Sequence, residues 1–181
     1  MLSYYMFPSY RKEEEQVAAH ERFTVDEMAK VAFKYRQDQY KEFGDSEEHW
    51  VKYIDEMVHY MNHPEDNPVY GHAKITCQAG ANTCWVTWRG EVAACGMGGG
   101  SLHDLSKESV KDAWKAIVEE VDQAKTSEKC AYCKYRKLCP VCSSAAYCET
   151  GDIAGTPEYL CAFAEKFAEY ILEEYERIHK S

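Results

Sequence analysis

Hydrophobic residues recur at helical spacing in two neighbouring stretches near the start of the chain, residues 24–43 and 46–61. These positions are Met28, Val31, Ala32, Tyr35 and Phe43 in the first stretch and Trp50, Tyr53, Ile54, Met57, Tyr60 and Met61 in the second. Thr24 can cap the first helix, and Gly44 can end it because glycine readily adopts a left-handed conformation. The short connection between the stretches predicts an antiparallel helical hairpin.

The same spacing returns twice toward the end of the chain. Ser106 can cap a third helix, and Thr156 with Pro157 can start the last one. The apolar faces are Val110, Trp114, Ile117, Val118 and Val121 in the third helix and Leu160, Phe163, Phe167, Ile171 and Tyr175 in the last.

Shorter runs between these helices have the composition of β-strands. Residues 73–77 form one probable strand. Residues 84–88 and 91–95 flank a two-residue turn that ends in glycine, which predicts a β-hairpin. Residues 96–100 are rich in glycine but lack the Lys-Ser/Thr of a phosphate-binding loop, so they read as a linker. Residues 1–8 form an apolar run that reads as a strand with no partner nearby.

These elements predict an α+β chain. A helical linker at 9–70 precedes a small cysteine-rich domain at 71–165, and the C-terminal helix closes that domain and continues through 166–181. A length of 181 residues allows one domain or two small ones.

Charge narrows the class of partner. The formal net charge is -10, which argues against a nucleic-acid surface because such a surface needs a basic stripe to displace counterions. No apolar run approaches the roughly 18 residues that span a bilayer. We therefore expect no membrane partner and a cytoplasmic protein.

Nine cysteines change this picture most. Five of them, Cys130, Cys133, Cys139, Cys142 and Cys148, lie close together and Cys161 follows at the start of the last helix. Two Cys-x2-Cys pairs allow both sulfurs of a pair to face one ion or cluster. Disulfide frameworks belong to small secreted chains, and no secretory signal is present, so metal binding is the better interpretation.

Zinc and iron–sulfur clusters both use four thiolates. Candidate donors are spread from Cys77 to Cys161, and the tight Cys-x2-Cys-x5-Cys run departs from paired zinc knuckles, where a longer finger separates the pairs. Both features favour clusters over zinc.

The combined pattern resembles a known family signature. Cys77-x12-Gly90-x4-Cys95, then Cys130-x2-Cys133-x5-Cys139-x2-Cys142, then Cys161 is similar to the seven-cysteine signature of the SPASM domain. That domain is the C-terminal auxiliary-cluster domain of radical S-adenosylmethionine (radical SAM) enzymes, many of which modify peptides or mature sulfatases. The resemblance covers about residues 72–165.

The resemblance implies two auxiliary [4Fe–4S] clusters. Cys77, Cys84, Cys95 and Cys142 would hold the first, and Cys130, Cys133, Cys139 and Cys161 the second. The family usually has three residues between the last two cysteines of the dense run, whereas Pro140 and Val141 are two. Cys148 is therefore a rival to Cys142.

A second departure is an absence. The catalytic cluster of radical SAM enzymes is bound by Cys-x3-Cys-x2-Cys, and no three cysteines here have that spacing. Residues 3–8 resemble a late strand of the radical SAM barrel, so the chain looks like the C-terminal part of a longer enzyme and inactive alone.

The implied roles of the clusters are electron relay, substrate docking or structural bracing. The implied partners are the radical SAM barrel and a peptide or protein substrate, and S-adenosylmethionine belongs only to the full enzyme. The alternatives are a zinc-binding interaction module and a free-standing ferredoxin-like electron carrier.

Overall fold

The computed structural model describes residues 22–43, 47–75, 77–96, 100–139 and 141–180. The strand expected at 1–8 and the helix stop expected at Gly44 lie outside these ranges. The described chain combines helices with a small antiparallel sheet, which confirms the α+β prediction. None of the described helices is both long and apolar enough to cross a bilayer.

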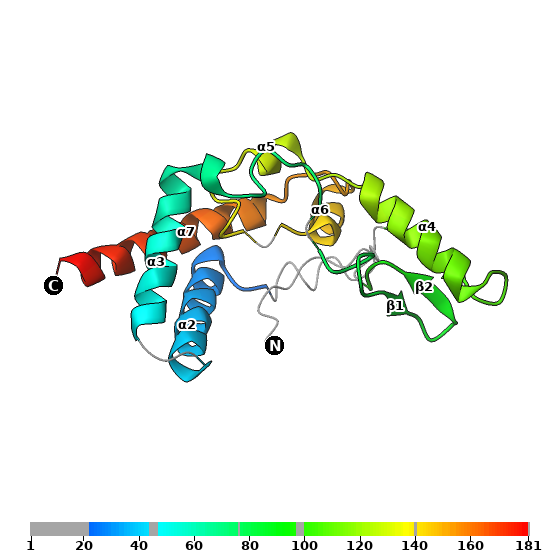
Figure 1. Ribbon diagram of the computed structural model, residues 1–181, viewed down its shortest axis with the longest axis horizontal. Helices are drawn as coiled ribbons and strands as arrows, with labels where there is room; N and C mark the ends of the chain where they lie inside the picture. The colour runs from blue at the N-terminus through cyan, green and yellow to red at the C-terminus, as the bar shows by residue number, and fades with distance from the viewer. Residues whose placement is uncertain (1–21, 44–46, 76, 97–99, 140, 181) are drawn as a thin grey trace.

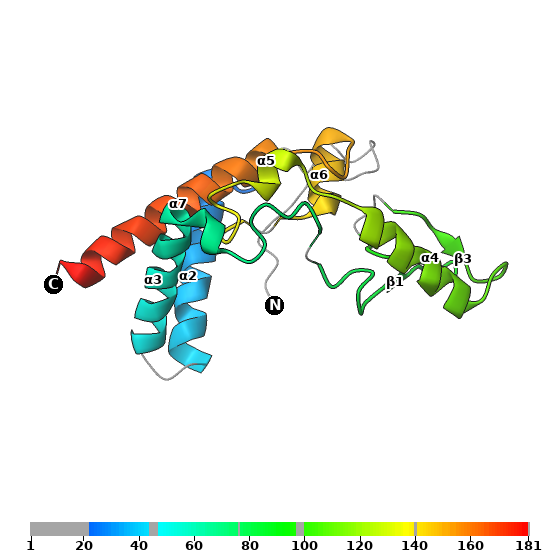
Figure 2. The same ribbon diagram turned by 45° about the horizontal axis from the view of Figure 1, so that its top comes forward.

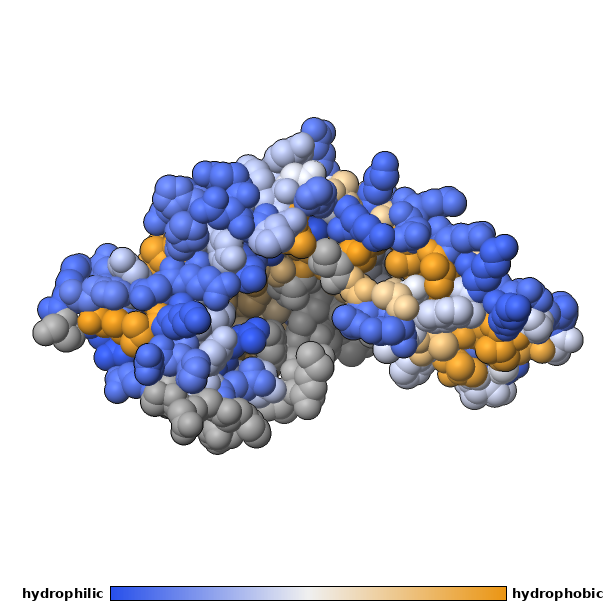
Figure 3. All heavy atoms as spheres, in the orientation of Figure 1, coloured by the Kyte–Doolittle hydropathy of each residue, from blue (hydrophilic) through white to orange (hydrophobic). Residues whose placement is uncertain are grey.

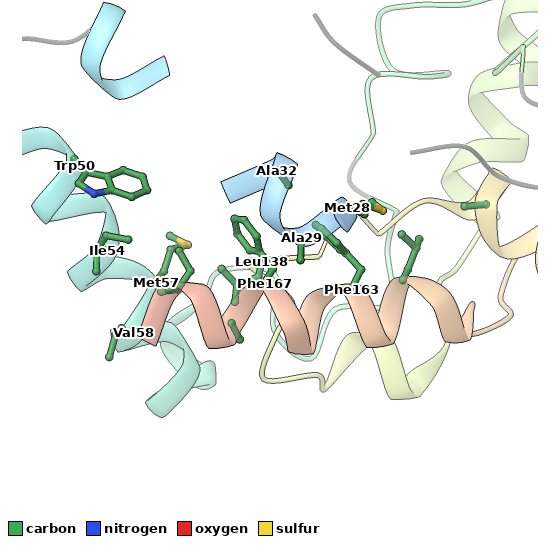
Figure 4. Packing of buried hydrophobic residues seen from close by; sticks show 14 residues of the cluster. Met28, Ala29, Ala32, Trp50, Ile54, Met57, Val58, Leu138, Phe163 and Phe167 are labelled. Carbon is green, nitrogen blue, oxygen red and sulfur yellow. The ribbon is translucent and has the colours of Figure 1, made fainter. Parts of the chain in front are cut away.

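Three long helices build one end of the molecule (Figure 1). They are α2 (Val25–Phe43), α3 (Glu47–Asn62) and α7 (Glu158–His179). α7 packs against both members of the predicted hairpin, and its apolar side chains face those of α2 and α3 (Figure 4). The buried residues of this core include Met28, Trp50, Ile54, Leu160, Phe163, Phe167 and Ile171. Both hairpin helices therefore bury their apolar faces largely against the last helix.

The start of α2 is fixed by a capping box. The Glu27 backbone N–H donates to Thr24 Oγ1 at 3.3 Å, and the Thr24 backbone N–H donates back to Glu27 Oε2 at 2.9 Å. Two backbone donors at the helix terminus are thereby satisfied. The prediction that Thr24 caps this helix is confirmed.

One buried polar contact joins α3 to α7. The Trp50 indole N–H donates to Glu174 Oε1 at 2.7 Å, and both groups are buried. Arg177 holds the same carboxylate with bonds of 2.6 and 2.8 Å. The carboxylate is therefore paired on both sides, as a buried charge must be.

The other end of the molecule is a three-stranded sheet covered by one helix (Figure 1). β1 (Trp85–Val86), β2 (Glu91–Ala93) and β3 (His103–Asp104) pair antiparallel in that order. Gly90 takes a φ of +79° in the turn between β1 and β2, which confirms the predicted hairpin. Val92 packs against Ala113 and Ile117 of α4 (Val110–Gln123), forming a second, smaller core.

Two predicted helix caps and one predicted strand are wrong. Ser109, rather than Ser106, caps α4, because Ser106 donates both its N–H and its hydroxyl to Asp104 in a preceding turn. Thr156 does not cap α7 with its side chain; it donates to Ser127 Oγ, and Pro157 occupies the cap position.

The expected strand at 73–77 does not form over the residues of this range that the structure describes, 73–75 and 77. Lys74 makes only an isolated bridge with Lys125, and Ala73 O accepts a bond of 2.8 Å from the Thr126 N–H. The segment is thus tied to the stretch before the dense cysteine run instead of to the sheet.

Short elements fill the middle of the molecule, between the three-helix end and the sheet (Figure 2). They are α5 (Glu128–Ala131) and α6 (Ser143–Thr150), with a 3-10 turn, η2 (Pro64–Asp66), after α3. This middle section carries the dense run of cysteines.

Candidate metal centre

Four of the predicted ligands line one cavity. Cys130, Cys133, Cys139 and Cys161 surround a space of about 80 Å³ beside the start of α7. They are the four residues that the resemblance assigns to the second cluster. The structure therefore brings this set together. Three of its donors come from the dense run, and the fourth, Cys161, lies 22 residues after Cys139.

Local hydrogen bonds shape the dense run into successive turns. Ser127 caps α5 by accepting from the Cys130 N–H at 3.1 Å. The Cys133 N–H then donates to Cys130 O, and the Arg136 N–H donates to Cys133 O at 3.0 Å. These turns direct both sulfurs of the first Cys-x2-Cys pair toward the same space.

Leu138 anchors the run to the three-helix core. Its side chain is buried among residues of α2, α3 and α7 (Figure 4), and Tyr135, Cys139 and Cys142 pack against the same core. On the other side, the Gly71 N–H donates to Ala131 O at 2.9 Å. The cysteine run is thus held between the helical core and the segment that follows α3.

Burial raises the pKa of two of the four thiols that line this cavity. Desolvation, with the neighbouring thiols Cys130, Cys161 and Cys133, raises the pKa of Cys139 to about 12. Burial also raises the pKa of Cys161, with Lys129 opposing the shift. Although Cys161 lies at the start of α7, its desolvation outweighs the nearby positive charge.

Arg136 lines the same cavity and is itself buried. Its Nη1 and Nη2 atoms have no hydrogen-bond partner within the described chain. Its positive charge lowers the pKa of Cys139, against the larger effect of burial. Glu165 is the only carboxylate lining the cavity, and no ion pair in the described residues joins it to Arg136.

A second, larger cavity contains three further predicted ligands. Cys77, Cys95 and Cys142 line a space of about 340 Å³ between α4 and the start of α6. Burial raises the pKa of Cys142, and the neighbouring Cys95 and Cys77 raise it further. Most other lining side chains are small or apolar, such as Ile75, Ala94 and Ile153. Glu120, Ser143 and Ser144 also line the cavity, and the three thiols are the sulfur donors among its described lining residues.

Gly80 positions the loop that follows Cys77. Its φ is +71°, and a Cβ there would lie 2.4 Å from Val121 Cγ2 of α4. Only glycine permits both this conformation and this close approach. The loop therefore packs directly against the helix that forms one wall of the larger cavity.

Cys84 and Cys148 lie outside the linings of both cavities. Cys84 is exposed and directly precedes β1. Cys148 lies near the end of α6. Burial raises its pKa, and the neighbouring Cys142 and Cys95 raise it further. Cys142 caps the same helix, with its Sγ accepting from the Ala145 N–H at 3.4 Å.

Backbone N–H groups point at sulfur in both sites. The Tyr135 N–H donates to Cys133 Sγ and the Ala79 N–H donates to Cys77 Sγ, each at 3.4 Å. Together with the bond to Cys142, these contacts stabilise a charged sulfur. Hydrogen bonds of this kind also tune the reduction potential of iron–sulfur clusters.

The grouping of the donors bears on the choice between a single ion and a cluster. Among the described residues, no three His, Cys, Asp or Glu side chains are grouped as ligands of one metal ion. A zinc site needs its sulfurs about 2.3 Å from a single ion. In a cubane each thiolate binds a different iron, so the four sulfurs stand farther apart around a larger group.

Comparison with known proteins gives one similarity. Over 88 residues, which are 46% of this chain, the sequence is 27% identical to an AdoMet-dependent heme synthase from Methanosarcina barkeri (strain Fusaro / DSM 804). The match spans only 25% of that protein's length. No family model matches the chain, and no solved structure matches it. The similarity indicates a relation to enzymes that depend on S-adenosylmethionine.

Sequence reasoning missed Arg136. A signal was present, because residues 129–142 contain Lys129, Lys134, Arg136 and Lys137 and no acidic residue, in a chain of net charge -10. Sequence alone does not distinguish a buried cation from three solvated ones. Burial of its side chain identifies Arg136 as the member of this basic run that belongs to the site.

Proposed function

We propose that the chain is the auxiliary cluster-binding part of a radical SAM enzyme and holds two [4Fe–4S] clusters. Cys130, Cys133, Cys139 and Cys161 would hold one, and Cys77, Cys95 and Cys142 would contribute to the other. The observation that carries the proposal is the convergence of the first four thiols on one cavity. The clusters would supply one-electron chemistry.

Charge supports this assignment. A cubane with four thiolates is an anion, and residues 129–142 carry four cations and no carboxylate. Arg136 lines the cavity, and the two terminal nitrogens of its buried guanidinium have no hydrogen-bond partner among the described residues. Such a group is costly in a protein interior unless an anion pairs with it.

The Methanosarcina relative supports the enzyme class. That relative is an AdoMet-dependent enzyme, which agrees with the resemblance of the cysteine pattern to the SPASM domain. The chain lacks the Cys-x3-Cys-x2-Cys trio, so the radical SAM barrel with its S-adenosylmethionine is proposed as a partner. A peptide or protein substrate, as the resemblance implies, would bind to the complete enzyme.

Anaerobic reconstitution with iron and sulfide tests the proposal. We expect a brown protein that absorbs broadly near about 400 nm and bleaches on reduction. Cys139→Ser should lose part of this absorption, because Cys139 lines the smaller cavity. Cys84→Ser is the control for losing a cysteine outside that cavity. A protein that stays colourless and instead takes up zinc would identify the zinc-binding module of the alternative interpretation.

A further inference from the structure

The side chain of Arg136 has no explained role in the fold. It is 5% exposed, and two of its three nitrogens lack a hydrogen-bond partner in the part of the chain that the structure describes. Removing such a group from water without a partner costs several kcal/mol, roughly. A buried arginine therefore indicates an anion that completes the site.

The position of the guanidinium shows where this anion lies. Arg136 lines the cavity formed by Cys130, Cys133, Cys139 and Cys161. Lys129 is the other cation that lines the cavity. It is exposed, so water already solvates its charge. Glu165 is the one carboxylate among the described lining residues, and neither terminal nitrogen of Arg136 has a hydrogen-bond partner there.

We propose that Arg136 is the internal counter-ion of the cluster held by these four cysteines. Its planar guanidinium would donate toward the sulfur atoms of the bound group and favour the more negative, reduced state of that group. No bond is made or broken, and the electron comes from the external reductant. This inference rests on the proposed function, and it adds a residue that sets the potential of one cluster.

Two physical effects lead to the same direction. A fixed positive charge stabilises the added electron, and hydrogen bonds to cluster sulfur raise the reduction potential. Both effects act in a buried site, where salt does not screen them. Removing Arg136 should therefore lower the potential at both low and high ionic strength.

The test isolates one cluster in the full-length chain. Cys77→Ser removes a ligand of the larger cavity, leaving about four irons per chain on the remaining cubane. Arg136→Met, Arg136→Lys and Lys134→Met are then made in this background. Lys134 is exposed and two residues away, so Lys134→Met makes the same charge change in a hydrated position. The midpoint potential is measured by dithionite titration followed by electron paramagnetic resonance.

We expect Arg136→Met to reduce the equilibrium constant for one-electron reduction at least tenfold, a shift of about 59 mV. Arg136→Lys should fall between Arg136→Met and the parent, because it keeps the charge and loses the planar pair of donors. Lys134→Met should match the parent. Equal potentials for Arg136→Met and Lys134→Met, at equal iron content, would overturn the inference.

Other outcomes also decide the question. If Arg136→Met keeps its helical circular dichroism but loses iron that Lys134→Met retains, the counter-ion role is supported. If Arg136→Met does not fold, a parent-like potential in Arg136→Lys overturns the hydrogen-bonding role. A parent protein that binds zinc and no iron refutes the proposed function itself. A normal cluster whose potential is unchanged in Arg136→Met refutes only the counter-ion role of Arg136.

Discussion

At the scale of single residues, burial favours the neutral form of the Cys139 and Cys161 thiols. Burial raises the pKa of Cys139 to about 12, so metal binding must release its proton. The same burial explains why the basic run matters. Positive charge from Arg136 and Lys129 favours the thiolate form that a metal requires.

Metal-free protein should lose stability as the pH rises from about 9 to about 12. In this window unfolded Cys139 loses its proton and folded Cys139 keeps it, so the folded state binds more protons and stability falls with pH. Urea midpoints of chelated, reduced protein at about pH 8 and about pH 10.5 measure this. The fall should be smaller in Cys139→Ser, and an identical fall in both proteins would contradict the assigned pKa.

The choice between Cys142 and Cys148 is a second prediction at this scale. Cys142→Ser should lose about half of the iron, because Cys142 lies in the cavity with Cys77 and Cys95. Serine keeps a side-chain acceptor for the start of α6, so the loss would report ligation instead of helix capping. Cys148→Ser is the matched control and should keep its iron. The reverse result would make Cys148 the ligand.

At the scale of elements, the sequence predicts regular structure well and connections poorly. The long helices repeat their apolar residues over several turns, so their existence and most of their buried positions follow from periodicity. Two predicted apolar positions, Val31 and Val110, are exposed instead. The hairpin turn follows from Gly90. Ser106 and Thr156 were wrong as caps because each hydroxyl has a nearby competing partner, Asp104 and Ser127. Such local competition is not visible in the spacing of residues.

The candidate site shows the same division. Spacing and family resemblance named the four cysteines that line the smaller cavity. Arg136 could not be named, because its role follows from burial, which depends on the packing of α7 against the cysteine run. The strand prediction at 73–77 is wrong for the described residues, because the Ala73 carbonyl accepts from the Thr126 N–H. Thr126 lies 53 residues after Ala73 in the sequence.

Leu138 connects the cysteine run to the helical core, so its truncation should affect both. Leu138→Ala should lower the free energy of unfolding by about 2–5 kcal/mol, the cost of a cavity in a packed core. Leu102→Ala makes the same change at a position that is 58% exposed and should cost less than about 0.5 kcal/mol. Urea unfolding measures both. Equal effects would show that Leu138 does not anchor the run.

At the scale of the whole molecule, two apolar cores lie at opposite ends, and α5 and α6, which flank the dense run of cysteines, lie between them. Figure 3 shows hydrophobic residues gathered over the end formed by the sheet and α4, and the large exposed ones there include Trp85, Val86, Trp88 and Val110. The three-helix end has the larger core. Stability should therefore depend on metal mainly in the middle section and the sheet.

Hydrogen exchange on chelated and reconstituted protein tests this distribution. Binding free energy becomes folding free energy where ligands come from distant segments. We expect residues 71–142 to lose protection on chelation and α2, α3 and the C-terminal half of α7 to keep it. Equal protection of residues 71–142 with and without metal would contradict a structural role for the clusters.

The most direct test of the central claim is the metal content of the reconstituted chain. Iron and acid-labile sulfide should each reach about eight per chain, as two cubanes require. Cys139→Ser should reduce both to about four, since it removes one ligand of the four-thiol cavity. Stoichiometric zinc with no iron, under the same anaerobic conditions and with iron and sulfide supplied, would contradict the account.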